Sequence, residues 1–489
     1  MSALLILLVL PLAGALLVVA LPQKAAVPAA LACVFGAAAG AGVLAIQVAT
    51  QGTIRLELGG WAPPLGIALA VDGLAATLLA MAALVVAGVA LSARHIMAPD
   101  IAGPRAAFGF WPLMLMLWAA LNVVFVSRDL FNLYVGLELL SLSAVALVAI
   151  GGKPEAIAAA IRYLFFALAG SLLFLAGVVL IYAGHGTLDI DLIAGRVPAP
   201  PDALALGLMT VGLMIKTALF PFHVWLPPAH AGAPAPASAL LSALVPKASF
   251  VIMLRLWFEA MPDRATDTAL LIIALMGTAA VIWGSLRAMS QDRLKLIVAY
   301  STVAQIGYLF VAFPLASEGT TGVPWSAGAW NGAVFLAISH GLAKAAMFLA
   351  VGQWIAVTSS DRLEDLRGMA QAVPMTVFAF ALSAITLTGL PPSGGFTGKY
   401  LVMTAAFASG QWVWALVMAM GGLLAVVYVY RPLALMFTPD HRTYDNLPPR
   451  SRQAVPLLLA GASVVLGVAS AAPFDLLAVG RPDVAEGGL

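Results

Sequence analysis

The stretch VGLMIKTALFPFHVWLP at residues 211–227 places a lysine inside an apolar run and follows it with a proline and a histidine. A transmembrane helix needs about 20 mostly apolar residues, and the run that ends here is long enough. A charged side chain at the centre of such a helix costs about 2.5 to 3.5 kcal/mol on insertion scales. A proline removes a backbone hydrogen bond and interrupts the helix. The stretch therefore predicts a discontinuous membrane helix that carries a buried cation, Lys216.

The composition extends this interpretation to the whole chain. The 489 residues are 62% hydrophobic and 9% charged, and the mean hydropathy is +1.02. Soluble globular domains have about 25% charged residues, so the composition excludes that class. The predicted fold class is an all-α polytopic membrane protein with about 14 transmembrane helices in the lipid bilayer. The expected spans are 2–22, 25–49, 72–93, 108–127, 130–150, 156–184, 203–224, 235–258, 268–287, 293–314, 328–357, 372–408 with an interruption, 411–437 and 453–473.

Lysines and arginines indicate how the helices are oriented, because cytoplasmic loops are enriched in both. Of the 24 such residues, 14 fall in loops after odd-numbered helices and six in the loops of the other side. Both termini are therefore predicted on the outer side. Lys295 is assigned to the first group of loops, and Arg128 and Arg255 to the second. The remaining cations lie inside expected helices, and all are lysines: Lys216, Lys247, Lys344 and Lys399.

Two of the expected helices are interrupted by proline in the same manner. The breaks are FPFHVW at 220–225 and GLPPSGGF at 389–396, and each has one of the four lysines beside it. The two helices are five apart, and this odd offset reverses their direction across the membrane, as in transporters built from inverted repeats. We expect one integral membrane domain. Its predicted parts are three N-terminal helices (1–107), a first five-helix repeat (108–258), a second five-helix repeat (268–437) and a C-terminal helix with a tail (438–489).

Glu138, in DLFNLYVGLELLSLSAVALV, is the only acid predicted well inside an apolar span. Four buried lysines would together cost roughly 10 kcal/mol or more, so they imply counter-charges, water or a function. A buried lysine can release its proton, whereas arginine stays charged. Glu138 paired with a lysine of a neighbouring helix is then either a structural ion pair or a switch. Asp72 and Asp129 stand at the starts of their spans, where the helix dipole favours an acid.

Histidines accompany the buried lysines. His340 and Lys344, in AISHGLAKAAMFLAVG, are four residues apart and share one helix face. Because histidine titrates near neutral pH, this pair would suit a proton relay, and the alternative is a hydrogen-bonded packing histidine. His223 lies beyond the first proline break, where it either extends the relay or caps freed carbonyls. His230, in LPPAHAGAPAP, is a further relay candidate or a structural hydrogen-bonding group. Lys247 directly follows a proline, so its helix is expected to kink at this cation.

Several kinds of chemistry are excluded by what the sequence lacks. It contains no phosphate-binding loop of the form GxxxxGK[ST]. The single cysteine, Cys33, rules out a disulfide within the chain and any cysteine-based metal or iron–sulfur site. Haem would need paired intramembrane histidines, and only His340 is clearly deep. We predict no cofactor, no metal site, no nucleic-acid partner and no redox chemistry by the chain itself.

Five ordered motifs carry a resemblance to a known family. They are VSRDLFNLYVGLELLSLSAVAL, IKTALFPFHVWLPPAHAGAPAPASALLSALVPKAS, RLKLIVAYSTVAQIGYLF, SHGLAKAAMFLAVG and LTGLPPSGGFTGKY. Together they resemble the antiporter-like subunits shared by Mrp-type cation/proton antiporters, respiratory complex I and membrane hydrogenases. The stretch LELGGWAPPLGIALAVDGLAA makes the chain most similar to the Mrp D-type subunit. The resemblance spans roughly residues 60–437.

The resemblance implies a fourteen-helix fold with two inverted five-helix units and a central polar axis for protons. In that family a glutamate of the fifth helix pairs with a lysine of the seventh, which here fall on Glu138 and Lys216. The remaining family positions fall on Lys247, on the pair His340 and Lys344, and on Lys399. Partners would be other membrane subunits of a larger complex in a bacterial inner membrane.

Three functions remain open from the sequence. The first is the proton-conducting subunit of a monovalent cation (Na+)/proton antiporter. The second is a proton-pumping, non-redox subunit of a complex I-like or hydrogenase complex that would use the same relay. The third is a scaffold with an inactive axis. The identity of the accompanying chains would separate the first two.

Overall fold

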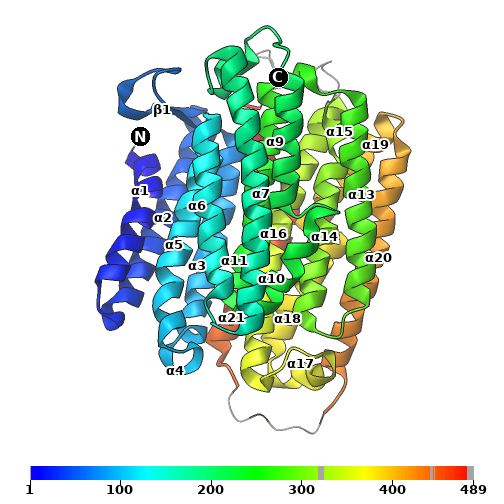
Figure 1. Ribbon diagram of the computed structural model, residues 1–489. Helices are drawn as coiled ribbons and strands as arrows, with labels where there is room; N and C mark the ends of the chain where they lie inside the picture. The colour runs from blue at the N-terminus through cyan, green and yellow to red at the C-terminus, as the bar shows by residue number, and fades with distance from the viewer. Residues whose placement is uncertain (1, 318–323, 441–443, 445–446, 482–489) are drawn as a thin grey trace.

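The computed structural model describes residues 2–317, 324–440, 444 and 447–481, and it is almost entirely helical (Figure 1). Within these residues, 13 helices are long and apolar enough to cross a membrane. The twelfth expected span comes in addition, because a break divides it into two shorter helices. Both termini lie at the same end of the bundle, hereafter the terminal end, as an even number of crossings requires. The predicted fold class is confirmed.

A hairpin and three membrane helices form the N-terminal part of the fold. The hairpin strands β1 (Ile54–Glu57) and β2 (Ala68–Val71) are antiparallel, with Ile54 opposite Val71. The hairpin lies at the terminal end, between α2 and α3 (Figure 1). The helices of this part are α1 (Ser2–Ala20), α2 (Gln23–Gln51), α3 (Gly73–Ile96) and the short α4 (Pro99–Ala102).

Two successive sets of helices then make up most of the bundle. The first set is α5 (Pro104–Val126), α6 (Leu130–Ala149), α7 (Pro154–His185), α8 (Ile190–Ala194), α9 (Asp202–Thr217), α10 (Leu226–Gly232), α11 (Ala235–Ala243) and α12 (Val245–Arg255), which ends in a π-helical turn (Leu256–Ala260). The second set is α13 (Asp267–Met289), α14 (Leu294–Val311), α15 (Phe313–Ala316), α16 (Pro324–Thr358), α17 (Met369–Ala372), α18 (Pro374–Thr388), α19 (Gly394–Ala408) and α20 (Trp412–Phe437). The chain ends with α21 (Arg450–Val468) and α22 (Ala471–Ala478).

Both predicted helix breaks are present, and they begin in the same way. Helix α9 ends at Thr217, and Ala218 takes the left-handed conformation with φ 61°. Helix α18 ends at Thr388, and Gly389 takes that conformation with φ 79°. A left-handed residue after the last helical one is a common way to end a helix, and it costs a non-glycine residue about 1–2 kcal/mol. The chain resumes as α10 in the first case and as α19 in the second.

Two tight turns are tied down in the same way at opposite ends of the bundle. The turn between α5 and α6 pairs with the segment after α7, through Ile190 N to Arg128 O (2.8 Å) and Leu130 N to Leu188 O (2.9 Å). The turn between α13 and α14 pairs with the segment after α16. Its hydrogen bonds join Leu294 N to Asp361 O (2.7 Å) and Leu363 N to Asp292 O (2.9 Å). The first pairing is at the terminal end and the second near α17, as two units of opposite direction would place them (Figure 1).

Glycines let the broken helices approach their neighbours closely. Gly212 of α9 faces Gly170 of α7, and Gly398 of α19 faces Gly332 of α16. A Cβ atom at residue 212 would lie 2.4 Å from the backbone oxygen of Gly170. Small residues at such contacts are typical of membrane helices, where close backbone packing drives association. The contact holds α9, which carries Lys216, against α7.

Replacing Gly212 by alanine is therefore expected to destabilise the protein by about 1–3 kcal/mol, because the added methyl group meets backbone that cannot move aside alone. The matched control is Gly207→Ala on the same helix, where a Cβ atom would meet no atom within 4 Å. This control is expected to be neutral or slightly stabilising, since alanine is a better helix former than glycine. Thermal unfolding of the two purified variants gives the comparison, and equal midpoints would contradict the packing argument.

Candidate functional site: a buried row of lysines and histidines

Glu138 of α6 and Lys216 of α9 form an ion pair beside the first helix break. The Lys216 Nζ atom lies 3.3 Å from Glu138 Oε1 and donates a second hydrogen bond of 2.8 Å to Ser141 Oγ. Ser171 of α7 also donates a hydrogen bond to Glu138. The Lys216 side chain is only 4% exposed, whereas that of Glu138 is 21% exposed. The acid therefore borders the outside of the bundle, and the lysine faces inward.

Lys247 of α12 meets His340 of α16 in the middle of the bundle. The Lys247 Nζ atom lies 2.9 Å from His340 Nδ1 and donates 2.8 Å to the backbone oxygen of Ser242. Both side chains are buried. The two nitrogens are within hydrogen-bond distance, and which of them donates depends on the tautomer of the imidazole ring and on the protonation of the lysine. As expected, the helix is interrupted beside Lys247, because α11 ends at Ala243 and α12 begins at Val245.

Lys344 lies one turn beyond His340 on α16, but it points to a different helix. Its Nζ atom donates to Ser301 Oγ and, at 2.9 Å, to the backbone oxygen of Val298, both on α14. His340 and Lys344 therefore do not contact each other as a pair. Each side chain meets a different neighbouring helix, α12 for His340 and α14 for Lys344. A lysine side chain is long enough to reach past the histidine to the next helix.

Lys399 of α19 lies beside the second helix break. Its Nζ atom donates to the backbone oxygens of Thr388 (3.1 Å) and Leu387 (3.3 Å), which are the last carbonyls of α18. It also lies over the Tyr308 ring, 4.3 Å from the centroid. A lysine satisfies free carbonyls at a helix end well. Among the described residues Lys399 makes no ion pair with a carboxylate, so it differs from Lys216 in this respect.

The two further histidine candidates have different surroundings. The contacts of His223 are with aromatic side chains, because its Nε2 accepts a hydrogen bond of 3.2 Å from Trp283 and its ring stacks on Phe220. His230 is buried, and its ring stacks on Phe348 of α16. It is within electrostatic reach of Lys247 and other lysines of the row. The Nδ1 atom of His230 has no hydrogen-bond partner among the described residues, so a structural hydrogen-bonding role is not seen there.

The sequence-based predictions placed Lys295 and Arg255 wrongly and gave no role to Trp225. Lys295 was assigned to a loop, yet it is buried and donates to the backbone oxygens of Ala231 and Ala233 at the end of α10. It lies in the first turn of α14, where an error of two residues in the boundary decides its environment. Trp225 caps a carbonyl freed by the first break, with Nε1 3.0 Å from Ile215 O.

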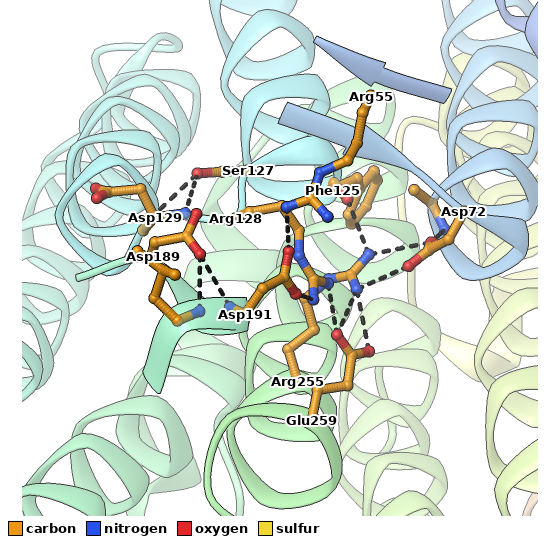
Figure 2. A network of polar contacts seen from close by, with 12 residues as sticks. Arg55, Asp72, Phe125, Ser127, Arg128, Asp129, Asp189, Asp191, Arg255 and Glu259 are labelled. Atoms are coloured by element: carbon orange, nitrogen blue, oxygen red, sulfur yellow. Dashed lines mark hydrogen bonds and ion pairs between the residues drawn. The ribbon is translucent and has the colours of Figure 1, made fainter. Parts of the chain in front are cut away.

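Arg255 was also assigned to a loop, and this prediction is wrong. The residue lies inside α12 and is completely buried. Its guanidinium group donates to both carboxylate oxygens of Asp72, at 2.9 and 3.1 Å, and to Glu259 at 3.0 Å. Asp72 is at the start of α3, as expected, and also accepts from Ala75 N. Arg255 therefore joins α3 and α12 at the terminal end (Figure 2).

The contacts of Arg255 continue into a larger network of charged groups, hereafter the rim network (Figure 2). Arg128, in the turn between α5 and α6, binds both Glu259 and Asp191. Arg55 of the hairpin binds Asp191 from the other side. Burial alone raises the pKa of Asp191, but the Arg128 and Arg55 guanidinium groups hold that pKa below its ordinary value. The members of the rim network are Arg55, Asp72, Arg128, Asp191, Arg255 and Glu259.

The fold and the buried row define a class of protein. Two discontinuous helices at matched places, each with a buried lysine, are typical of membrane transport subunits built from inverted repeats. Residues 127–425 match the family described as "NADH:quinone oxidoreductase/Mrp antiporter, TM". The chain therefore belongs to this family of antiporter-like membrane subunits, and the resemblance predicted from the motifs is confirmed.

Similar proteins come from both branches named in that description. The chain is 34% identical to the N-type subunit of the NADH-quinone oxidoreductase of Desulforudis audaxviator, over 88% of this chain and 87% of the relative. It is 30% identical to the D-type subunit of the Na(+)/H(+) antiporter of Alkalihalophilus pseudofirmus, over 78% and 76%. A chain in the structure of the Mrp complex from Dietzia sp. shares the fold, with a TM-score of 0.87 at 24% identity over 99% of this chain and 96% of that one.

Proposed function

We propose that the chain is the proton-translocating subunit of a multi-subunit monovalent cation (Na+)/proton antiporter. The contact between Glu138 and Lys216 is the observation that carries the proposal, because it places an acid at the edge of the bundle against the first member of an inward row of bases. The similarity to the D-type subunit of an Na(+)/H(+) antiporter supports this assignment. The partners are other membrane subunits of the complex, protons and Na+.

The row works as a series of sites that hold and release a proton. Protonation of Glu138 removes the negative charge that holds the Lys216 ammonium group, and the lysine then releases its proton inward. Lys247 and His340 are in hydrogen-bond contact at 2.9 Å, so a proton can pass between them, and they form the middle of the row. The described side chains make no direct hydrogen bond between Lys216 and Lys247, so proton transfer between these two lysines requires an intervening carrier. His230, Lys344 and Lys399 extend the row toward the second break.

A second candidate is the pump module of a redox complex, in which partner chains transfer electrons and this chain moves protons. The 34% identity to the N-type subunit of an NADH-quinone oxidoreductase favours it specifically. Both candidates use the same residues in the same roles. Both place the protein in a bacterial inner membrane with the termini on the periplasmic side. The loop cations support this orientation, because 13 remain on one side and five on the other once Lys295 and Arg255, which lie in helices, are left out.

Purification of the native complex through a tag on this chain separates the candidates. For the antiporter we expect only membrane chains to co-purify, with no flavin or iron–sulfur absorbance, and proteoliposomes of the complex should release protons when Na+ is added. Flavin or iron–sulfur absorbance in the complex, with no response to Na+, would replace the antiporter by the redox pump. If the complex moves protons neither with Na+ nor with electron transfer, the remaining function is the scaffold with an inactive axis.

A further inference from the structure

A pocket opens at the end of the bundle opposite the termini. Its volume is about 620 Å³. It lies where the segment after α16 meets the last turns of α20, close to α17 (Figure 1). We name it the arginine pocket after its most frequent lining residue. Its lining residues are Asp292, Arg362, Leu363, Glu364, Arg367, Tyr430, Arg431, Ala434 and Leu435.

The arginine pocket carries an excess of positive charge. Arg362 pairs with Glu364 at 2.7 Å, and Arg431 pairs with Asp292 at 2.8 Å. Arg367 is exposed and makes no ion pair or hydrogen bond with the described residues. Arg431 also donates to the backbone oxygens of Gln291 (3.2 Å) and Met289 (3.4 Å), which fix its guanidinium group at the pocket. Exposed ion pairs contribute little to stability, so Arg362 and Arg367 in particular remain available to a stronger anion. Three arginines against two carboxylates therefore make an anion site.

The corresponding place in the first set of helices is closed by the protein itself. There Arg128, in the turn before α6, pairs with Glu259, and their side chains are 9% and 12% exposed. In the second set Asp292, in the turn before α14, pairs with Arg431, and these side chains are 74% and 49% exposed. The two turns are held by matching hydrogen bonds, so the places are equivalent. Only the second place leaves room and an unpaired arginine for another molecule.

The surroundings of the pocket belong to the membrane surface. Tyr430, Phe437 and Val427 of α20 are exposed large side chains on the outside of the bundle. Tyrosine near a helix end is typical of the boundary between lipid tails and headgroups. Ala434 and Leu435 line the pocket on the same helix. An occupant would thus have an anionic part among the arginines and an apolar part along α20.

We propose that the arginine pocket binds the phosphate of an anionic phospholipid. Guanidinium groups bind phosphate oxygens in pairs and with good geometry, which makes arginine better suited than lysine to this ligand. Basic pockets between membrane helices on the cytoplasmic side are suited to such headgroups. Free phosphate has the same charged part, but it would not use the apolar face of α20. An acidic segment of a neighbouring subunit is the competing occupant.

The test uses the intact complex in nanodiscs of phosphatidylcholine with graded amounts of phosphatidylglycerol. Native mass spectrometry measures how much phosphatidylglycerol the released complex keeps. Arg367→Gln is expected to weaken retention about fivefold, the effect of one arginine near a membrane surface. Because Arg367 makes no ion pair with the described residues, this change does not threaten the fold. Arg450→Gln, an exposed arginine at the start of α21 outside the pocket, is the matched control and should bind like the wild type.

Three results would overturn the proposal. One is equal phosphatidylglycerol retention by Arg367→Gln, by Arg450→Gln and by the wild type. A second is displacement of the lipid by soluble glycerol phosphate as readily as by vesicles of phosphatidylglycerol, which would assign the pocket to free phosphate compounds. The third uses a photo-reactive phenylalanine analogue in place of Tyr430: capture of lipid supports the proposal, whereas capture of a neighbouring subunit would assign the pocket to a protein contact.

Discussion

Alanine in place of Lys216 is expected to lower the rate of proton movement by about 10²-fold or more, the usual effect of removing a group that transfers protons. The change removes the partner of Glu138 and the only base in contact with that acid among the described residues. Lys216→Arg gives a sharper result. Arginine keeps the charge and the ion pair but does not release its proton, so this variant should assemble normally and still be inactive.

The measurement is Na+-dependent proton release from proteoliposomes of the complex, with assembly followed by co-purification of the partner chains. Lys24→Ala, which removes an exposed lysine in the first turn of α2, is the control and should keep the wild-type rate. Glu138→Ala should be as inactive as Lys216→Ala, since each group is the other's partner. Full exchange in both Glu138→Ala and Lys216→Ala would contradict the proposed route. Activity in Lys216→Arg would show that Lys216 acts only through its charge.

Leucine in place of Arg255 is expected to cost about 3–5 kcal/mol of stability, the typical effect of removing one partner from a buried ion pair. The change leaves two carboxylates, Asp72 and Glu259, facing each other, and Arg128 is the one cation of the rim network that still binds either of them. We expect little protein to accumulate in the membrane. The contrast is Arg55→Leu in the same network, because this exposed pair contributes only about 0–1 kcal/mol.

A rescue experiment distinguishes a charge effect from lost packing. Combining Arg255→Leu with Asp72→Asn and Glu259→Gln removes the unpaired charges, and this triple variant should recover much of the lost thermal stability and accumulation. A triple variant less stable than Arg255→Leu alone would show that the arginine acts through packing. An unfolding midpoint of Arg255→Leu equal to that of the wild type would show that the rim network does not stabilise the fold.

The sequence was sufficient for the fold because a membrane helix has a strong and simple signal. Long apolar runs predicted the helices, and the prolines at 221 and 392 predicted the breaks, whose left-handed residues Ala218 and Gly389 the structure then showed. Lys216, Lys247, Lys344 and Lys399 were found by counting charges left inside helices. This count works because a charge in lipid is too costly to occur without a reason.

The wrong predictions concern residues at helix ends, where a count of charges inside helices depends most on the exact boundaries. Arg255 and Lys295 lie within the last or first turns of their helices, and a shift of a few residues changes the prediction from loop to buried helix. Partners were equally out of reach, since helical spacing tells which side chains share a face but not which neighbouring helix they meet. His340 and Lys344 show this, because one binds α12 and the other α14.

The matched turns before α6 and α14 differ in the sign of charge that they carry. Arg128 pairs with Glu259 at the first turn, and Asp292 pairs with Arg431 at the second, so each place keeps one cation and one anion. The first pair is nearly enclosed, whereas the second is open to solvent. Because dissolved salt screens exposed charges far more than enclosed ones, the two ends of the bundle should respond differently to ionic strength.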